Sequence, residues 1–235
     1  MSQFPEQARV VIIGAGIVGN CVVGHLAEKG WTDMVMIDKG PLPNPGGSTG
    51  HASNFIFPVD HGRAITQLTL DSARQYEEMG VSRTCGGIEL AQTKCWGIEA
   101  ELLGPDGVLE LFPWISREKI LGGFYTPSVS VVDSLRAGTI FRERAQEKGA
   151  LAVFANTEVT GIGVEDGRVR SVKTSRGEVR ADYVIIACGV WSPRIAEMAG
   201  AAIPLVPVVH QMIDAGPVPQ FAQAKGEIEY PILRD

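Results

Sequence analysis

The chain has 235 residues, of which 45% are hydrophobic and 20% charged, and its net charge is −6 at pH 7. This length is enough for one large domain or two small ones, and the composition is that of a globular protein. The acidic balance argues against general binding to nucleic acid or to anionic membranes. No apolar stretch approaches the roughly 20 residues that span a bilayer.

The N-terminal residues 1–6 have neither the basic region nor the apolar region of a secretory signal. The first expected strand follows directly, which leaves no room for a transit peptide. The cysteines show no C-x-x-C spacing and are Cys21, Cys85, Cys95 and Cys188. We therefore expect reduced thiols, no disulfide framework, no metal site and a cytoplasmic location.

Residues 8–38 are typical of a strand, a helix and a second strand. The first apolar run leads into a G-x-G-x-x-G turn at Gly14, Gly16 and Gly19. In such a turn the first glycine allows the tight bend, the second lets backbone approach a pyrophosphate, and the third lets the helix pack on the strand. The helix, expected from Ile17 to Lys29, then offers free N–H groups and a positive dipole end to phosphates.

Asp38 ends the second apolar run and lies 19 positions after Gly19. An acid at this place accepts hydrogen bonds from ribose hydroxyls and disfavours the extra phosphate of NADP. The combination of strand, glycine turn, helix and distal acid predicts a dinucleotide site. The alternative is a tight strand-to-helix turn that binds no ligand.

Residues 40–50 are too rich in Pro and Gly for a helix or a central strand. His51 follows this loop, and chain connectivity places it near the phosphate site. Its imidazole can act as a general base, a hydrogen-bond partner or a covalent attachment point for the 8α-methyl carbon of a flavin. A loop histidine that faces solvent is the other interpretation.

Further elements follow in chain order. Helical spacing is found in 62–79 and in Ser134 to Lys148. Strand patterns occur in Gly87 to Ala91, in Gly122 to Pro127 and in residues 151–154. Three strands then form a meander over residues 159–165, 168–174 and 177–186, because Asp166-Gly167 and Arg176-Gly177 are hairpin signals.

These patterns predict an α/β fold. A parallel sheet carries a helix on one face and the antiparallel meander on the other. No internal repeat or low-complexity tract interrupts it.

Several runs together resemble the FAD domain of the dimethylglycine and sarcosine dehydrogenase/oxidase family, which belongs to the D-amino-acid-oxidase-like flavoproteins. The first glycine motif is general to flavoproteins, whereas the Gly-Ser-Thr-x-His-Ala run and the Trp-Gly-Ile-Glu run are far more specific. The runs are residues 10–19, 36–39, 47–52, 96–99 and 207–211. The likeness covers nearly all of the chain.

The resemblance implies a Rossmann-like ββα FAD-binding part with the meander, joined to part of an antiparallel substrate-binding sheet. We place the FAD-binding part at about residues 1–60 and 150–200, and the substrate-binding part at about 61–149 and 201–235. It also implies FAD attached covalently through His51, and oxidation of an N-methyl amine such as dimethylglycine or sarcosine.

His210 lies in an apolar, proline-rich strand pattern. A core or edge histidine with a backbone partner is the simple interpretation. The resemblance implies an active-site histidine in a similar Pro-x-x-His-Gln run. A histidine with the ordinary pKa of about 6.5 can keep a substrate amine neutral, and loss of a hydride requires a neutral amine.

Other positions are open to two interpretations. Val159 contacts the adenine through its backbone or is a simple strand residue. Gly189 brings backbone close to the cofactor, and Trp191 is either a core residue or a wall of the cofactor site. Cys188 has no basic neighbour in sequence and is expected to be a buried thiol. The expected cofactor-binding set is Gly14, Gly16, Ile17, Val18, Gly19, Asp38, Lys39, Ser48, Thr49, His51, Val159, Gly189 and Trp191.

The chain departs from the family pattern at three places. It reaches Asp235 inside an expected substrate-domain strand, where the family fold continues. Only Lys94 and Cys95 separate Thr93 from Trp96, where relatives have about a dozen more residues. Gly50 stands where the family often has an aromatic residue, and Asn54 stands where glycine is common. We therefore expect an N-terminal fragment, incomplete at its C-terminus and inactive on its own, and a tetrahydrofolate site only in sequence beyond it.

Three functions are consistent with these observations. The first is FAD-dependent oxidation of an N-methylated glycine, with hydride transfer from substrate to flavin N5. The second is a related flavoenzyme, such as a glycine oxidase or D-amino-acid dehydrogenase, which often holds FAD without a covalent bond. The third is a dinucleotide-binding or interaction module without chemistry. No feature assigns an electron acceptor or an oligomeric state.

Overall fold

The computed structural model describes residues 3–52, 54–60, 62–89, 97–209, 211, 213, 216–225 and 228–234. They fall into two compact units. The first combines Met1–Ala52 with Ser134–Val209, and the second combines Ser53–Asp133 with His210–Asp235.

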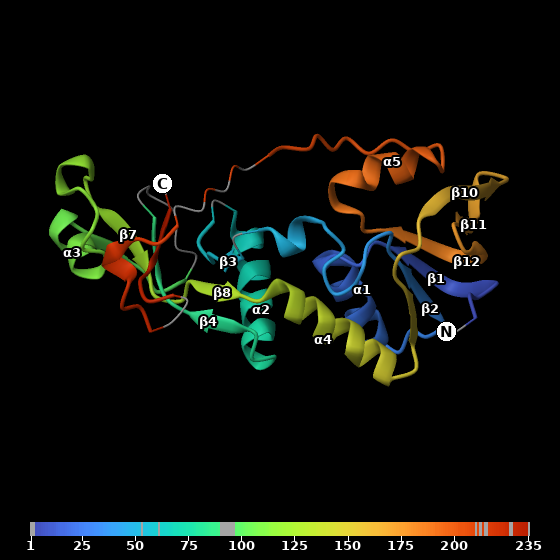
Figure 1. The fold of residues 1–235 in the computed structure, drawn as a ribbon, viewed down its shortest axis with the longest axis horizontal. Coiled ribbons are helices and arrows are strands. Elements are labelled where there is room, and N and C mark those ends of the chain that lie inside the picture. Colours follow the sequence, from blue (N-terminus) through green and yellow to red (C-terminus); the bar gives the residue numbers. More distant parts are fainter. Residues whose placement is uncertain are drawn as a thin grey trace. The chain divides into compact units, whose positions relative to one another are not determined.

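The first unit is built on a six-stranded sheet in the order β10-β11-β12-β1-β2-β9 (Figure 1). Strand β1 pairs in parallel with β2 and β12, and β2 pairs in parallel with β9. Strands β10, β11 and β12 form the antiparallel meander expected from the two hairpin signals. The strands are β1 (Gln7–Ile13), β2 (Met34–Ile37), β9 (Leu151–Phe154), β10 (Val159–Glu165), β11 (Arg168–Thr174) and β12 (Gly177–Ile186).

Alternate residues of the parallel strands point to opposite faces, and both faces are buried. Val11 and Ile13 of β1 belong to a core cluster that also includes Val172 and Val179 of the meander. Val10 and Ile12 belong to a second cluster with residues of the helices. The structure thus has helices on one face and the meander on the other, as expected, and the meander is continuous with the sheet through β12.

The helical face is covered by two helices rather than one. These are α1 (Ile17–Glu28) and α4 (Ser134–Glu147). They approach closely at Gly24, where an added Cβ would lie 2.5 Å from Cδ1 of Phe141. Because of this packing α4 belongs to the first unit, whereas the sequence places the segment in the substrate-binding part. The first unit also contains η1 (Ser48–Gly50), η3 (Gly189–Trp191) and α5 (Ser192–Glu197).

The second unit contains two small sheets, in the orders β13-β5-β7-β6 and β3-β8-β4. Its helices are α2 (Arg63–Glu78), α3 (Pro105–Leu111), η2 (Arg117–Lys119) and η4 (Pro219–Phe221). Its strands are β3 (Phe55–Ile56), β4 (Ser82–Thr84), β5 (Gly87–Glu89), β6 (Glu101–Leu103), β7 (Gly123–Thr126), β8 (Ser130–Val132) and β13 (Ile232–Arg234). A small core forms around Ile88, Val108 and Ile120.

Two details differ from the expectation. The larger sheet is mixed, because β13 pairs in parallel with β5. A parallel pair needs a long connection, and the chain between these strands passes through the whole second half of the first unit. The loop 40–50 ends in one turn of 3-10 helix, η1, since a single turn tolerates glycine at its end. None of the described helices is long and apolar enough to cross a membrane.

Candidate dinucleotide-binding site

The glycine-rich turn lies at the carboxyl end of β1, where parallel strands place their binding sites. Gly14 has a φ of +106°, and an added Cβ there would lie 2.3 Å from the carbonyl oxygen of Ala187. A Cβ on Gly19 would lie 1.9 Å from the carbonyl oxygen of Gly14. Both positions therefore require glycine for the turn itself, as the spacing predicts.

Helix α1 begins directly after Gly16. The N–H groups of its first turn, at Ile17, Val18 and Gly19, have no carbonyl partner inside the helix. The Ile17 N–H donates to Oγ1 of Thr49 at 2.9 Å, and Val18 is 62% exposed. The N–H groups of Val18 and Gly19, at the positive end of the helix dipole, fit a pyrophosphate.

Asp38 is fixed at the end of β2 by backbone donors. Its Oδ2 accepts the N–H of Ala15 at 2.7 Å, and its Oδ1 accepts the N–H of Gly40 at 2.8 Å. A carboxylate has about four acceptor sites. Two therefore remain for ribose hydroxyls, so the acid fits the role that its spacing predicts.

The turn that contains His51 is held against the start of α1. The Thr49 hydroxyl accepts the Ile17 N–H, and the Thr49 carbonyl accepts the Ser134 hydroxyl at 2.6 Å. The N–H of His51 donates to the carbonyl of Ser48 at 3.0 Å, which closes the turn. The His51 side chain is exposed. His51 thus lies two residues from a direct contact with the first turn of α1.

Lys39, Gly47 and Trp191 come together at the same end of the sheet. The Lys39 ammonium lies 4.6 Å from the ring centroid of Trp191. A Cβ on Gly47 would lie 3.7 Å from the Trp191 ring. Trp191 is 40% exposed, so it is a surface ring beside the glycine-rich loop and not a core residue. Gly189, two residues earlier, has a φ of +52°.

Two further predicted residues have different outcomes. Val159 is 7% exposed and belongs to the core beside the meander, and it lies opposite Thr174 in the pairing of β10 with β11. It is close in sequence to Thr157, whose N–H donates to the Asp38 carbonyl at 2.8 Å. His210 lies outside the described residues, as does Trp96.

Asn20 and Ser134 contact this site although the sequence did not predict a role for them, and Cys188 was predicted only as a buried thiol. The Cys188 thiol donates to the carbonyl of Ile13 at 3.1 Å. Burial, together with the nearby Asp38 carboxylate, raises the pKa of Cys188 to about 11. Asn20 is 3% exposed and contacts the glycine turn. A polar residue on the buried face of an apolar helix was the signal available for Asn20.

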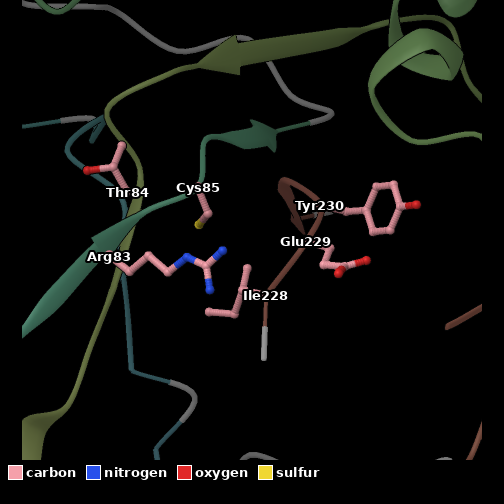
Figure 2. A pocket seen from close by; sticks show the side chains of 6 residues that line it. All are labelled: Arg83, Thr84, Cys85, Ile228, Glu229 and Tyr230. Atoms are coloured by element: carbon pink, nitrogen blue, oxygen red, sulfur yellow. The ribbon is translucent and has the colours of Figure 1, made fainter. Parts of the chain in front are cut away.

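A separate pocket of about 400 Å³ lies in the second unit (Figure 2). It is lined by Arg83, Thr84, Cys85, Ile228, Glu229 and Tyr230. Burial raises the pKa of Cys85, and the Arg83 guanidinium opposes that shift. Across the described ranges no group of three His, Cys, Asp or Glu side chains is placed to hold a metal ion.

Comparison with known proteins identifies the family. The family described as FAD dependent oxidoreductase matches residues 9–235. The chain belongs to this family. The glycine turn, the start of α1 and Asp38 together fit an FAD molecule, because they offer backbone donors for its pyrophosphate and an acceptor for its ribose.

The chain is also similar to individual curated proteins. It is 30% identical over 254 residues to mouse "Dimethylglycine dehydrogenase, mitochondrial". The aligned region covers 99% of this chain and 29% of that protein. It is 29% identical over 211 residues to the mouse pyruvate dehydrogenase phosphatase regulatory subunit, covering 80% of this chain and 24% of that protein. The chain thus spans less than a third of the length of these relatives.

The solved structure of L-proline dehydrogenase from P. horikoshii has the same fold. Its TM-score is 0.75 at 25% identity, covering 84% of this chain and 57% of that chain.

Proposed function

We propose that the first unit binds FAD and that the chain is part of an enzyme that demethylates an N-methylated glycine, dimethylglycine or sarcosine. The observation that carries this proposal is the bridge made by Thr49, which joins the turn of His51 to the first turn of α1. The bridge holds the backbone of the turn that carries His51 beside the proposed pyrophosphate site, which supports a role for its imidazole in holding the cofactor. The similarity to dimethylglycine dehydrogenase supports the substrate class.

Each residue of the site has one task in this proposal. Gly14 and Gly19 shape the turn, Gly16 and Val18 hold the pyrophosphate with their N–H groups, and Ile17 lies beside them with its own N–H bonded to Thr49. Asp38 accepts the ribose hydroxyls.

At the flavin end, an imidazole nitrogen of His51 holds the 8α-methyl carbon covalently, while Ser48, Thr49, Lys39, Gly189 and Trp191 line the path of the cofactor. Val159 offers its backbone to the adenine. The bound flavin supplies the two-electron acceptor for amine oxidation.

His210 keeps the substrate amine neutral by accepting its proton, and it orients the amine. The substrate is a small N-methyl amine. Folate is assigned to no residue of this chain. The proposed location is the cytoplasm, and cell fractionation tests it against the mitochondrial location in the printed name of the mouse relative.

Covalent attachment is tested with His51→Ala in the complete gene product. We expect the parent protein to retain flavin after acid precipitation and the variant to release it, while the variant still binds FAD reversibly. His25→Ala is the matched control, because His25 is a half-exposed histidine on α1 that contacts Glu28 at 3.2 Å. Flavin retained by the His51 variant would contradict the assignment.

The substrate is tested by dye reduction with dimethylglycine, sarcosine, glycine and L-proline. Reduction by the two N-methyl amines supports the proposal. Reduction only by glycine or L-proline would favour a related flavin amine oxidase, an alternative that the L-proline dehydrogenase structure keeps open.

A second candidate is a non-catalytic FAD-binding module, favoured by the similarity to a phosphatase regulatory subunit. Bound FAD that none of these amines reduces would support it.

A further inference from the structure

A buried polar contact between two helices lies next to the glycine turn. Asn20, on α1, is 3% exposed, and Arg142, on α4, is 7% exposed. Nη1 of Arg142 donates to Oδ1 of Asn20 at 3.2 Å. Nδ2 of Asn20 donates to the carbonyl oxygens of Ala15 at 2.7 Å and Gly16 at 3.1 Å.

Arg142 determines which way the Asn20 amide faces. A guanidinium is a donor only, so it must meet the amide oxygen and not the amide nitrogen. The NH₂ group of Asn20 is then directed at the two carbonyls of the turn. Gly138 leaves room for this arrangement, since an added Cβ there would lie 3.0 Å from Nδ2 of Asn20.

The two carbonyls in turn fix the direction of two N–H groups. In a planar trans peptide the C=O of one residue and the N–H of the next point in opposite directions. With the Ala15 and Gly16 carbonyls held by Asn20, the N–H groups of Gly16 and Ile17 point away from Asn20. The Ile17 N–H does so, because it donates to the Thr49 hydroxyl on the far side of the turn.

Arg142 is costly to keep in this place. Burial lowers the pKa of its guanidinium, and no carboxylate of the described residues lies within ion-pair distance of it. The adjacent Glu143 is paired with Arg136 at 3.4 Å. The other hydrogen bond of Arg142 is donated by Nη2 to the Thr139 hydroxyl at 3.4 Å. A buried cation without an ion pair contributes little to stability, which points to a role other than stability.

We propose that Arg142 and Asn20 are positioning residues that hold the N–H group of Gly16 toward a pyrophosphate, while the Ile17 N–H stays bonded to Thr49. The inference rests on the proposed FAD site and adds two residues to it. Arg142 acts only through Asn20, and neither side chain contacts the ligand. Their effect is therefore selective for ligands that contain the pyrophosphate.

The test compares ADP with adenosine by calorimetry, in the His51→Ala background so that the site can be emptied of flavin. We expect Arg142→Met and Asn20→Leu each to weaken ADP binding by about tenfold, with adenosine binding unchanged. The double variant should lose no more than Asn20→Leu alone. Arg142→Lys, which keeps a cationic hydrogen-bond donor, should bind ADP more tightly than Arg142→Met.

Phe141→Leu is the control. Phe141 is on the same helix and packs against Gly24, but it takes no part in the hydrogen bonds that join Arg142, Asn20 and the glycine turn. It should lower the melting temperature and leave the preference for ADP intact. Equal losses for ADP and adenosine, or the same loss in Phe141→Leu, would overturn the inference alone. A parent protein that binds neither FAD nor ADP would overturn the proposed function and the inference with it.

Discussion

The carboxylate of Asp38 accepts the N–H of Ala15 at 2.7 Å, which ties the end of β2 to the glycine turn at the end of β1. The same carboxylate accepts the Gly40 N–H at 2.8 Å. One acid thus holds two loops of the site while its remaining lone pairs are available to ribose hydroxyls.

Asp38→Asn should weaken this junction, because an amide presents one acceptor oxygen and one donor where two donors must be met. We expect the free energy of unfolding to fall by about 1–3 kcal/mol and FAD to bind about tenfold more weakly. Asp33→Asn is the control. Asp33 also accepts a backbone N–H, from Arg9, but it lies at the opposite end of β2 and has a φ of 56°, which Asn tolerates. Similar losses in both variants would refute the special role of Asp38.

Gly19→Ala should prevent α1 from packing on β1, since its Cβ would lie 1.9 Å from a backbone oxygen that cannot move freely. The expected loss in unfolding free energy is about 3 kcal/mol. Gly107→Ala in α3 is the comparison, because the nearest atom there is 3.4 Å away. It should gain about 0.5–1 kcal/mol from helix propensity. Chemical denaturation measures both, and a stable Gly19 variant would contradict the close approach.

Ser134→Ala removes the hydroxyl that holds the Thr49 carbonyl. We expect a loss of about 1 kcal/mol in unfolding free energy and slower covalent incorporation of FAD, because the turn of His51 becomes looser. Ser72→Ala on α2 is matched, since its exposed hydroxyl donates to the Leu68 carbonyl at 2.9 Å. It should change neither quantity. Incorporation of FAD at the parental rate in Ser134→Ala would show that the hydrogen bond from Ser134 to Thr49 is dispensable.

Cys21 and Cys188 should resist alkylation in the folded chain. Burial raises the pKa of each thiol to about 11, so at pH 8 about one thiol in a thousand is ionised. We expect slow labelling by iodoacetamide, faster with each unit of pH, and rapid labelling after unfolding. Mass spectrometry of the labelled peptides measures it. Fast labelling at pH 8 would contradict the burial of these thiols.

The same shifts predict a loss of stability in alkali. Because the folded-state pKa lies above the unfolded value, the unfolded chain releases protons first as the pH rises. The contribution of these thiols is complete below about pH 8.5 and declines toward pH 11. The Cys21→Ala/Cys188→Ala variant should show a smaller decline across this window, and an identical decline would refute the assignment.

The local sequence pattern was sufficient to predict elements that have a long periodicity or clear turn residues at their ends. Helix α1, the three strands of the meander and β9 lie where the sequence predicts them, because periodicity and Asp-Gly or Arg-Gly turns are local properties. Strands β3 and β8, of two and three residues, were not predicted. They are defined by partners far away in sequence, as in the pairing of Phe55 with Val131.

The sequence by itself determined the glycine turn, Asp38 and the family, since these depend on residue type at fixed spacing. Only the tertiary structure decided that α4 packs beside α1, and with it the contacts of Ser134 with Thr49 and of Arg142 with Asn20. These pairs are separated by 85 and 122 positions. No local pattern encodes such a contact, because it exists only when the fold brings two helices onto the same face of the sheet.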